Sequence, residues 1–501
     1  MEKLKPIFCS LLVLGLLVLS TAIVSRSAFG ARPKWVGTYR GKRGYSLGSV
    51  IELEDRGYLI GGGSGLIGDK ERRMWIMETT ESGELLWKKL YRTEFQYRIR
   101  FMSSGENEGS LFAGQLSTPG DFNRVNALIA RVGEKGETEW GLQFGKSLED
   151  YDPSRPKIPF ICDFYSLTRA HDGGYLAAGF YMPEKELEYG KTENKFEPSA
   201  YGILVKISDE GKVEWQKKYG AEGIHSFLSV ERSKDGNYFA VGEVGSYGEK
   251  SRPETWVVKL TPDGEVIWQK TFSEKNKANP PLSSEIGRKE AGTSFDVTSD
   301  GGLVVTGINQ IAAEGEFNAE IWIMKLNERG EIDWHRTYGG RGDDSPTNIL
   351  ETPDGGYIFA GTTDSFGGPS KVFRIWLMKL EKDGTIRWEK TYGEPGTSTY
   401  GSIKVLTGGD LIVHGEMERQ TESNPVGFMM ILNKKGELKN LEDTVLQASP
   451  TDARTGIFAV SSTREKIPYE ESNIPVSGAK IEVQGDDVGL DFLVEPPGHS
   501  D

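Results

Sequence analysis

Short apolar runs separated by glycine-rich turns recur along most of the chain. In the clearest copy, the turn at Asp354 (Asp-Gly-Gly) precedes the apolar run Tyr357–Gly361, a second run Ile375–Leu380, an Asp-Gly turn at Asp383 and a further run from Trp388. Runs of this length between turn residues predict strands, because Asp-Gly and Gly-Gly supply the positive φ angles of tight hairpins. Each unit therefore predicts a four-stranded meander. We name its strands A to D, with A before the Asp-Gly-Gly turn and D beginning at the tryptophan.

Seven copies of this unit follow one another. Four of the spacings between them are 52 to 54 residues, and insertions at loops lengthen the others. Their D strands begin at Trp35, Trp87, Trp140, Trp215, Trp268, Trp334 and Trp388. An aromatic residue follows four positions later, at Tyr39, Tyr91, Phe144, Tyr219, Phe272, Tyr338 and Tyr392. A glycine closes strand B at Gly62, Gly114, Gly179, Gly242, Gly307, Gly361 and Gly415. Another lies in the C–D turn at Gly83, Gly136, Gly211, Gly264, Gly330, Gly384 and Gly436.

The repeats predict an all-β fold, a β-propeller of four-stranded antiparallel blades, because such units bury both faces only by stacking around a ring. Seven clear blades occupy residues 31–440. The first D strand, from Trp35 to Tyr39, has no A–C strands before it. We expect it to complete the last blade and to close the ring, which removes exposed sheet edges.

Residues 441–501 leave two alternatives, a degenerate eighth blade or a C-terminal tail. The runs that begin at Thr444, Gly456 and Ala479 resemble strands A, B and C of a further copy. However, Val460 stands where the strand-B glycine belongs, and no tryptophan follows.

The segment from Lys259 to Trp268 resembles the docking motif of the quinoprotein-type (PQQ-like) propeller repeat, in which a turn glycine precedes a tryptophan by four residues. This spacing recurs in six copies, and in the seventh Asn440 replaces the tryptophan. The resemblance covers residues 35–440 and implies the propeller fold. It leaves activity open, because the superfamily includes dehydrogenases, an outer-membrane assembly scaffold and secreted repeat proteins of other kinds. The quinone-binding members use adjacent paired cysteines, which this chain lacks, so we expect no cofactor.

The first thirty residues resemble a targeting segment. Lys3 and Lys5 precede an apolar run over residues 7–24, and small residues at Ala28 and Gly30 offer a cleavage site. The run is also long enough to remain as a membrane anchor. Both alternatives predict an extracytoplasmic protein, either secreted or in the cell envelope. Without Cys9 of this segment only Cys162 remains, so no intramolecular disulfide is expected.

The amino-acid composition limits the classes of binding partner. The formal net charge is -14, which excludes a nucleic-acid partner because phosphates would be repelled over most of the surface. The 63 glycines against 22 prolines fit many tight turns rather than a disordered chain. The remaining partners are protein and glycan, with a membrane tether through residues 7–24 as an addition.

Alternate turns of a meander lie on the same side, so a propeller built from these units has two different faces. The A–B and C–D turns are short and uniform and make a plain face. The D–A and B–C loops carry the length variation and share the opposite face, the loop face, where function is most expected. The longest insertions, residues 145–164 and 181–200, both belong to blade three. Candidate binding residues on this face are Tyr151, Asp152, Tyr181, Tyr189, Tyr247, Arg341, Asp343 and Asp344.

Several other signals are better explained by packing or turn chemistry. Tryptophans repeated once per blade indicate packing between blades. Turn aspartates such as Asp354 are expected to bond their own backbone, because single carboxylates lack the six to eight oxygens that calcium prefers. The five histidines show no metal-ligand spacing. The tripeptide Arg341-Gly-Asp343 overlaps a repeated loop, and a serine column in strand A (Ser49, Ser166, Ser229, Ser294 and Ser402, with Asn348) fits crowding near the axis.

Two functions of different classes follow from these patterns. The first is a binding or scaffold module that contacts protein or glycan through the loop face; replacement of residues 182–198 should then remove binding and leave the fold. The second is a propeller enzyme, a glycoside hydrolase or lyase or a degenerate quinoprotein dehydrogenase. Glycoside hydrolysis needs two carboxylates about 5–9.5 Å apart. No catalytic or metal-binding residue is assigned from the sequence.

Overall fold

A computed structural model describes residues 36–40, 45–53, 57–64, 73–92, 96–104, 109–118, 121–145, 160–183, 199–221, 223–245, 254–274, 294–313, 316–366, 372–393, 397–419, 425–437, 447–450, 454–456, 460–463, 469–471, 476–478, 482–484 and 491–495. The contacts divide the chain into residues 1–33, which lie outside this description, and the compact unit Lys34–Asp501. The second unit is all-β. Among the described residues no helix is long and apolar enough to cross a membrane.

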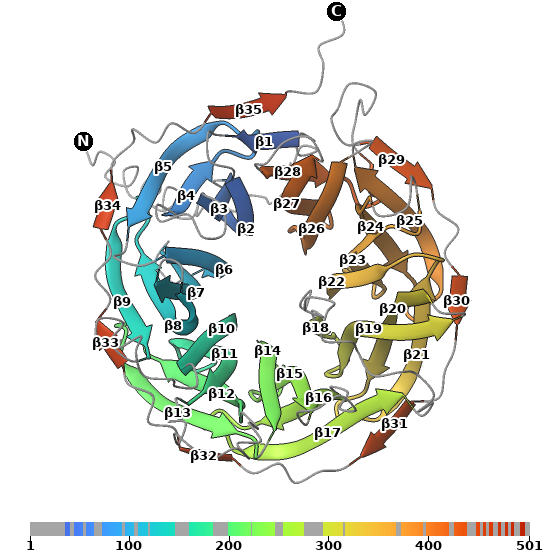
Figure 1. Cartoon of the computed structure of the whole chain (residues 1–501), viewed down its shortest axis with the longest axis horizontal. Coiled ribbons are helices and arrows are strands. Elements are labelled where there is room, and N and C mark those ends of the chain that lie inside the picture. Colours follow the sequence, from blue (N-terminus) through green and yellow to red (C-terminus); the bar gives the residue numbers. More distant parts are fainter. Residues whose placement is uncertain are drawn as a thin grey trace, which may run out of the picture. The chain divides into compact units, whose positions relative to one another are not determined.

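Seven four-stranded antiparallel blades make up this unit (Figure 1). Blade 1 consists of β2 (Tyr45–Leu53), β3 (Gly57–Ser64), β4 (Arg73–Thr79) and β5 (Leu85–Arg92). Blade 2 consists of β6 (Gln96–Ser104), β7 (Ser110–Thr118), β8 (Asp121–Val132) and β9 (Thr138–Phe144). Blade 3 consists of β10 (Phe160–Arg169), β11 (Tyr175–Met182), β12 (Tyr201–Ile207) and β13 (Val213–Tyr219). Blade 4 consists of β14 (Ile224–Arg232), β15 (Tyr238–Gly245), β16 (Glu254–Leu260) and β17 (Val266–Glu274).

The remaining blades follow the same order. Blade 5 consists of β18 (Ser294–Val297), β19 (Leu303–Ala313), β20 (Glu316–Leu326) and β21 (Ile332–Gly339). Blade 6 consists of β22 (Asp344–Glu351), β23 (Tyr357–Thr363), β24 (Arg374–Leu380) and β25 (Ile386–Gly393). Blade 7 consists of β26 (Thr397–Val405), β27 (Leu411–Arg419), β28 (Val426–Leu432) and β1 (Val36–Arg40).

The ring closes through the N-terminal strand, as the sequence predicts. β1 pairs antiparallel with β28, so blade 7 contains strands from both ends of the repeat region. Contacts between β2 and β27 join blade 7 to blade 1, and the A strands of the other neighbouring blades also contact each other (Figure 1). Each A strand lies nearest the axis.

The C-terminal segment adds a fifth strand to the outer edge of every blade. These strands are β29 (Gln447–Pro450) on β25, β30 (Arg454–Gly456) on β21, β31 (Val460–Thr463) on β17, β32 (Tyr469–Glu471) on β13, β33 (Val476–Gly478) on β9, β34 (Glu482–Gln484) on β5 and β35 (Asp491–Glu495) on β1. We call this set the belt. It runs around the ring against the chain order of the blades (Figure 1). The described strands of this segment thus join the seven existing blades and form no separate eighth blade.

Among the residues that the structure describes, the buried apolar side chains form seven clusters, and each cluster lies between two neighbouring blades. Three of the four strand-C tryptophans pack deepest. Trp75, Trp256 and Trp376 are almost fully buried, whereas Trp322 and the described D-strand tryptophans are half-buried. The tryptophan columns therefore belong to the packing between blades.

The aromatic column of strand D and the glycine column of the C–D turn form one joint between blades. The hydroxyl of Tyr338 in blade 5 donates a hydrogen bond of 2.6 Å to the carbonyl oxygen of Gly384 in blade 6, and Tyr91, Tyr219 and Tyr392 repeat this bond. The ring of Trp334 covers the same glycine, where a Cβ would lie 2.8 Å from its nearest ring carbon. Gly384 also has a φ of 81°, so both the backbone and the neighbouring ring require glycine.

Substitution of Tyr338 by Phe is expected to lower the free energy of unfolding by about 1–2 kcal/mol. The change removes the hydroxyl and leaves the buried Gly384 carbonyl without its donor. Urea denaturation would measure it, with Tyr201→Phe as a half-exposed control. Equal stability of the two variants would show that the joint does not depend on this bond.

The serine column of strand A links neighbouring inner strands. The hydroxyl oxygen of Ser49 accepts a hydrogen bond from the Met102 amide, and that of Ser166 accepts one from the Val230 amide. Asn348 bonds both the amide and the carbonyl of Ile403 in the same way. These bonds support the packing interpretation of this column.

Candidate functional site

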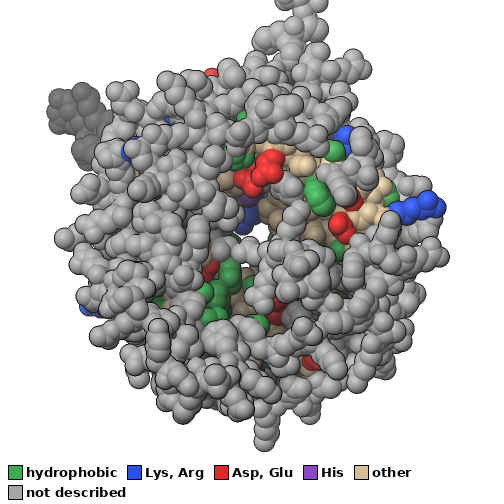
Figure 2. All heavy atoms as spheres, viewed as in Figure 1, with side chains coloured by type: hydrophobic (Ala, Val, Ile, Leu, Met, Phe, Trp, Pro, Cys, Tyr) green, Lys and Arg blue, Asp and Glu red, His purple; other side chains and the backbone are tan. Residues whose placement is uncertain are grey.

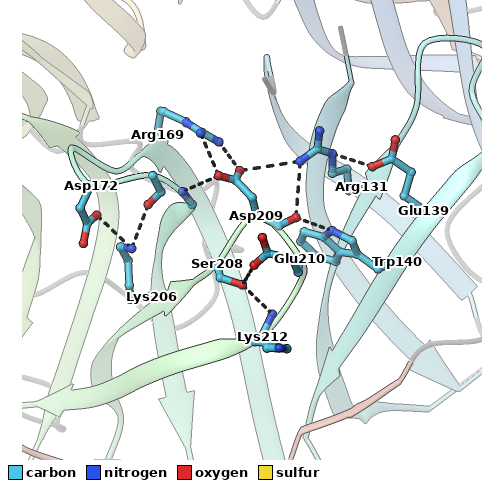
Figure 3. Close-up of polar contacts among 12 residues, drawn as sticks. Arg131, Glu139, Trp140, Arg169, Asp172, Lys206, Ser208, Asp209, Glu210 and Lys212 are labelled. Atoms are coloured by element: carbon cyan, nitrogen blue, oxygen red, sulfur yellow. Dashed lines mark hydrogen bonds and ion pairs between the residues drawn. The ribbon is translucent and has the colours of Figure 1, made fainter. Parts of the chain in front are cut away.

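The plain face uses its polar side chains to hold the ring together (Figure 3). Asp209, in the C–D turn of blade 3, accepts hydrogen bonds from the Arg169 guanidinium and from the amide of Gly174 in the A–B turn. Its carbonyl oxygen accepts a bond of 3.0 Å from the indole of Trp140 in blade 2. Arg131 of blade 2 also pairs with Asp209, at 3.7 Å. The two turns of one blade and the neighbouring blade are thus tied to one carboxylate.

Buried lysines of strand C form ion pairs with the turn aspartates on the same face. Lys379 of strand C lies 2.9 Å from Asp354, and Lys206, Lys259 and Lys325 pair with Asp172, Asp235 and Asp300. Asp354 also accepts a hydrogen bond from the amide of Gly356, as expected for a turn aspartate. Among the described residues no group of three or more histidine, cysteine or acidic side chains is placed to hold a metal ion.

The D–A and B–C loops lie together on the opposite face, and in blade 6 they are joined directly. The amide of Asp343 donates to the carboxylate of Asp364, and the amide of Asp364 donates to the carbonyl oxygen of Asp343. The amide of Gly342 donates to the hydroxyl of Ser365 at 2.8 Å. In blades 3 and 4, Ala200 exchanges backbone hydrogen bonds with Gly223 and His225.

Asp344 is the buried centre of the blade-6 loop pair. Its Oδ2 accepts hydrogen bonds from the amide of Gly340 and the hydroxyl of Ser365, at 2.9 Å each. Burial raises the pKa of Asp344 to about 7, although hydrogen bonds to its carboxylate act in the opposite direction. The carboxyl therefore titrates near neutral pH while it connects the two loops.

The Asp344→Asn variant is expected to lose part of the pH dependence of stability. The folded state holds the Asp344 proton more tightly than the unfolded chain, so this group's contribution to stability is complete below about pH 4 and is lost as the pH rises through about 7. Wild type should therefore lose stability between pH 5 and pH 8, and the variant should lose less. Chemical denaturation at several pH values measures this, with Glu328→Gln, on the plain face, as an exposed control. Parallel curves for wild type and Asp344→Asn would refute this role.

Half-exposed aromatic side chains gather at the loop-face end of blade 3. Tyr165 and Phe180 stack with ring centroids 5.7 Å apart, and Tyr181 lies opposite Tyr201 on the neighbouring strand while its ring contacts Phe160. Tyr165 is the extra residue of a β-bulge in β10, which turns its side chain out of the regular alternation. At the corresponding bulges, blades 1, 4 and 6 have Gly48, Leu228 and Thr347. The stacked pair is thus particular to blade 3 among these blades.

The predicted site residues divide into two groups. The structure describes Tyr181 in β11 and Arg341, Asp343 and Asp344 between blades 5 and 6; it does not bring these two sets together. Tyr151, Asp152, Tyr189 and Tyr247 lie outside the described residues. Sequence reasoning missed Tyr165 and Phe180, although their aromatic character at positions that are not aromatic in most copies was an available signal.

A second concentration of polar groups lies along the axis. Strand A of each blade carries one residue two positions after the serine column, and in blades 4, 5 and 7 these are Glu231, Asp296 and Lys404. The amide of Val297 donates to Glu231 at 3.1 Å, and the amide of Glu351 donates to Asp296 at 2.6 Å. Figure 2 shows a central opening with acidic, basic and histidine side chains at its wall.

Enclosure by the ring changes the titration of this axial cluster. Burial, together with the neighbouring Asp296, raises the pKa of Glu231 well above its usual range. Burial raises the pKa of Asp296 to about 6, and a hydrogen bond joins the two carboxyl groups. Burial also lowers the pKa of Lys404. The two carboxyl groups therefore share a proton near neutral pH, since two adjacent charges would repel each other.

Comparisons with known proteins leave the family open. No family model matches the chain, and no curated protein matches it. Among solved structures it is similar to a mutant levansucrase of B. megaterium, with 10% sequence identity and a TM-score of 0.31 over 58% of this chain and 85% of that one. A likeness of this size carries no argument about activity. The resemblance to quinoprotein-type repeats stays a prediction.

Proposed function

We propose that this protein is an extracytoplasmic binding or scaffold propeller that contacts a protein or glycan ligand through its loop face. The observation that carries the proposal is the separation of repeated from unrepeated side chains. The repeated tyrosines, turn glycines and strand-C lysines make joints between and within blades. The half-exposed Tyr165, Phe180 and Tyr181 gather at the loop-face end of one blade. Tyrosine and other aromatic residues are enriched at recognition surfaces, where they contribute large contact area.

The enzyme alternative has weaker support in the described residues. The carboxyl groups of Glu231 and Asp296 are joined by a hydrogen bond. Two carboxyl groups in direct contact leave no room for the glycosidic bond or the water that must lie between them, since glycosidases separate them by about 5–9.5 Å. These strands also end at the A–B turns, so the pair lies toward the plain face, away from the variable loops.

Replacement of residues 184–198 by a short Gly-Ser linker is expected to abolish binding and leave the fold intact. The replaced segment follows the end of β11, so the strand itself remains complete. A second variant, Tyr165→Ser with Phe180→Ser, should weaken binding by at least about tenfold if the stacked pair forms a contact centre. Binding would be measured on a glycan array and by affinity capture from cell-envelope extract.

The matched control alters the plain face. Glu328→Ser with Arg329→Ser changes two exposed residues of the blade-5 C–D turn and should bind like wild type. Full binding by both loop-face variants, or loss of binding in the plain-face control, would contradict the proposal.

A further inference from the structure

The axial cluster brings together side chains from four blades. Lys404 of blade 7 extends over the ring of Phe101 in blade 2, with 5.4 Å from its Nζ to the ring centroid. The same ammonium lies within electrostatic range of Glu231 and Asp296, which belong to blades 4 and 5. Blades 2, 4, 5 and 7 are distributed around the ring, so these side chains meet at the axis and not within one blade interface.

The Lys404 ammonium has no hydrogen-bond or ion-pair partner in the part of the chain that the structure describes, and it lies over the aromatic ring of Phe101. An enclosed cation without an acceptor loses much of its hydration and gains little in return. Its side chain is half-buried, so part of it remains accessible to solvent. The hydrogens that do not face Phe101 are therefore available to a ligand.

Opposite charge lies near the lysine on two other blades without forming an ion pair with it. The Glu231 carboxyl group accepts a hydrogen bond from the Val297 amide, and the Asp296 carboxyl group accepts one from the Glu351 amide. The two carboxyl groups also share a hydrogen bond. No ion pair joins either carboxyl group to Lys404 within the described residues. The site thus presents a positive and a negative end that are held apart by different blades.

The other described titratable groups around the cluster do not neutralise the charges of Lys404 and the carboxyl pair. His414 faces Lys404 from the same sheet, is 4% exposed, and its Nδ1 has no hydrogen-bond partner in the described structure. Burial lowers the pKa of His414 to about 3, so it is neutral. Glu351 accepts bonds from the amide and hydroxyl of Ser299, and Glu52 accepts bonds from Thr407. Among the described residues, the lysine and the carboxyl pair are the charges left for a ligand.

We propose that Lys404 and the Glu231–Asp296 pair form a binding site for a small zwitterion, a free α-amino acid or a compound with the same charge pattern. The ligand's carboxylate contacts the Lys404 ammonium, and its ammonium contacts the carboxyl pair. A ligand with a single charge pairs with one end of the site and leaves the charge at the other end unpaired. A neutral polyol leaves the charges at both ends unpaired. A zwitterion satisfies both ends at once. This site is independent of the loop face.

Binding is coupled to proton release. The carboxyl pair holds one shared proton near neutral pH, and an ammonium group at the pair favours full ionisation of both carboxyls. The ligand therefore displaces up to one proton at pH 7. His414 stays neutral through this exchange, because burial lowers its pKa to about 3.

Isothermal titration of the full chain with a panel of free amino acids, glycine being the smallest, tests the site. We expect saturable binding of at least one member with Kd of about 1 mM or below. Acetate and methylamine, which each carry one of the two charges, should bind at least about tenfold more weakly. Titrations at pH 7 in two buffers with different ionisation enthalpies should reveal proton release.

Three variants locate the binding. Lys404→Met and Asp296→Asn should each weaken binding by at least about tenfold, and Glu231→Gln should remove the proton release while it keeps the shape of the site. Lys434→Met, an exposed turn lysine of the same blade, is the matched control and should bind like wild type. Thermal melting shows which variants are folded. Absence of binding by the whole panel, equal binding of acetate, or unchanged binding by a folded Lys404→Met protein would overturn the proposal.

Discussion

Removal of residues 447–501 is expected to turn the protein into a self-associating species, because it uncovers the outer edge of all seven blades. In the full chain each belt strand pairs with the D strand of one blade, which in blade 7 is β1. Uncovered edges present rows of unpaired amide and carbonyl groups that pair with other chains. Size-exclusion chromatography at several protein concentrations should show a concentration-dependent shift to larger species that the full chain does not show.

The expected effect lies in association more than in the stability of one ring. A backbone hydrogen bond contributes about 1 kcal/mol net, while ordering one residue costs about 1–2 kcal/mol, so pairing of the belt nearly cancels its own entropy cost. A shorter truncation is the control. Removal of residues 485–501 uncovers only the edge of β1 and should cause weaker association. If the longer truncation behaves like the full chain at every concentration, the belt has no protective role.

Substitution of Trp376 by Ala is expected to lower the free energy of unfolding by about 3–5 kcal/mol. Trp376 is fully buried between blades 5 and 6. Its ring lies 5.2 Å from that of Phe366 and 6.0 Å from that of Phe359, and its indole nitrogen donates to Glu389. Alanine leaves a cavity among rigid neighbours and removes these contacts. Denaturant titration measures the loss.

The comparison with Trp388→Ala makes this prediction specific. Trp388 belongs to the D-strand column, is half-buried and packs over Gly436 of the next blade. Its truncation should cost clearly less, because part of the ring already faces solvent and water can occupy the space. Equal losses of stability in the two variants would mean that the difference in burial between Trp376 and Trp388 does not determine their contributions.

The repeat made the ring predictable from the sequence. Seven aligned copies define the blades, and the lone D strand at β1 requires a partner, which it finds in β28. The sequence also shows both partners of the joint between blades, the strand-D aromatic residues and the C–D turn glycines. It does not show that they contact each other, because Tyr338 and Gly384 belong to different repeats and only the folded ring brings the hydroxyl to the carbonyl oxygen.

The belt and the axial cluster were beyond this reasoning for physical reasons. Belt strands such as β30 and β32 are three residues long and pair through the backbone, which imposes no side-chain pattern. Glu231, Asp296 and Lys404 occupy equivalent positions in their repeats. The other repeats have different residues at this position, so a search for conserved repeat residues does not detect it. Unrepeated charges at an inward position of strand A were the available signal.

Hydrogen–deuterium exchange on the protein with and without its best-binding array glycan or captured protein tests the central claim most directly, because it shows which face the ligand covers. Binding through the loop face predicts slower exchange in residues 160–166, 180–183, 340–344 and 363–366. The plain-face turns at residues 208–212, 327–331 and 381–385 should exchange as in the free protein. Protection confined to those plain-face turns, with unchanged exchange in the loop-face segments, would contradict the proposed function.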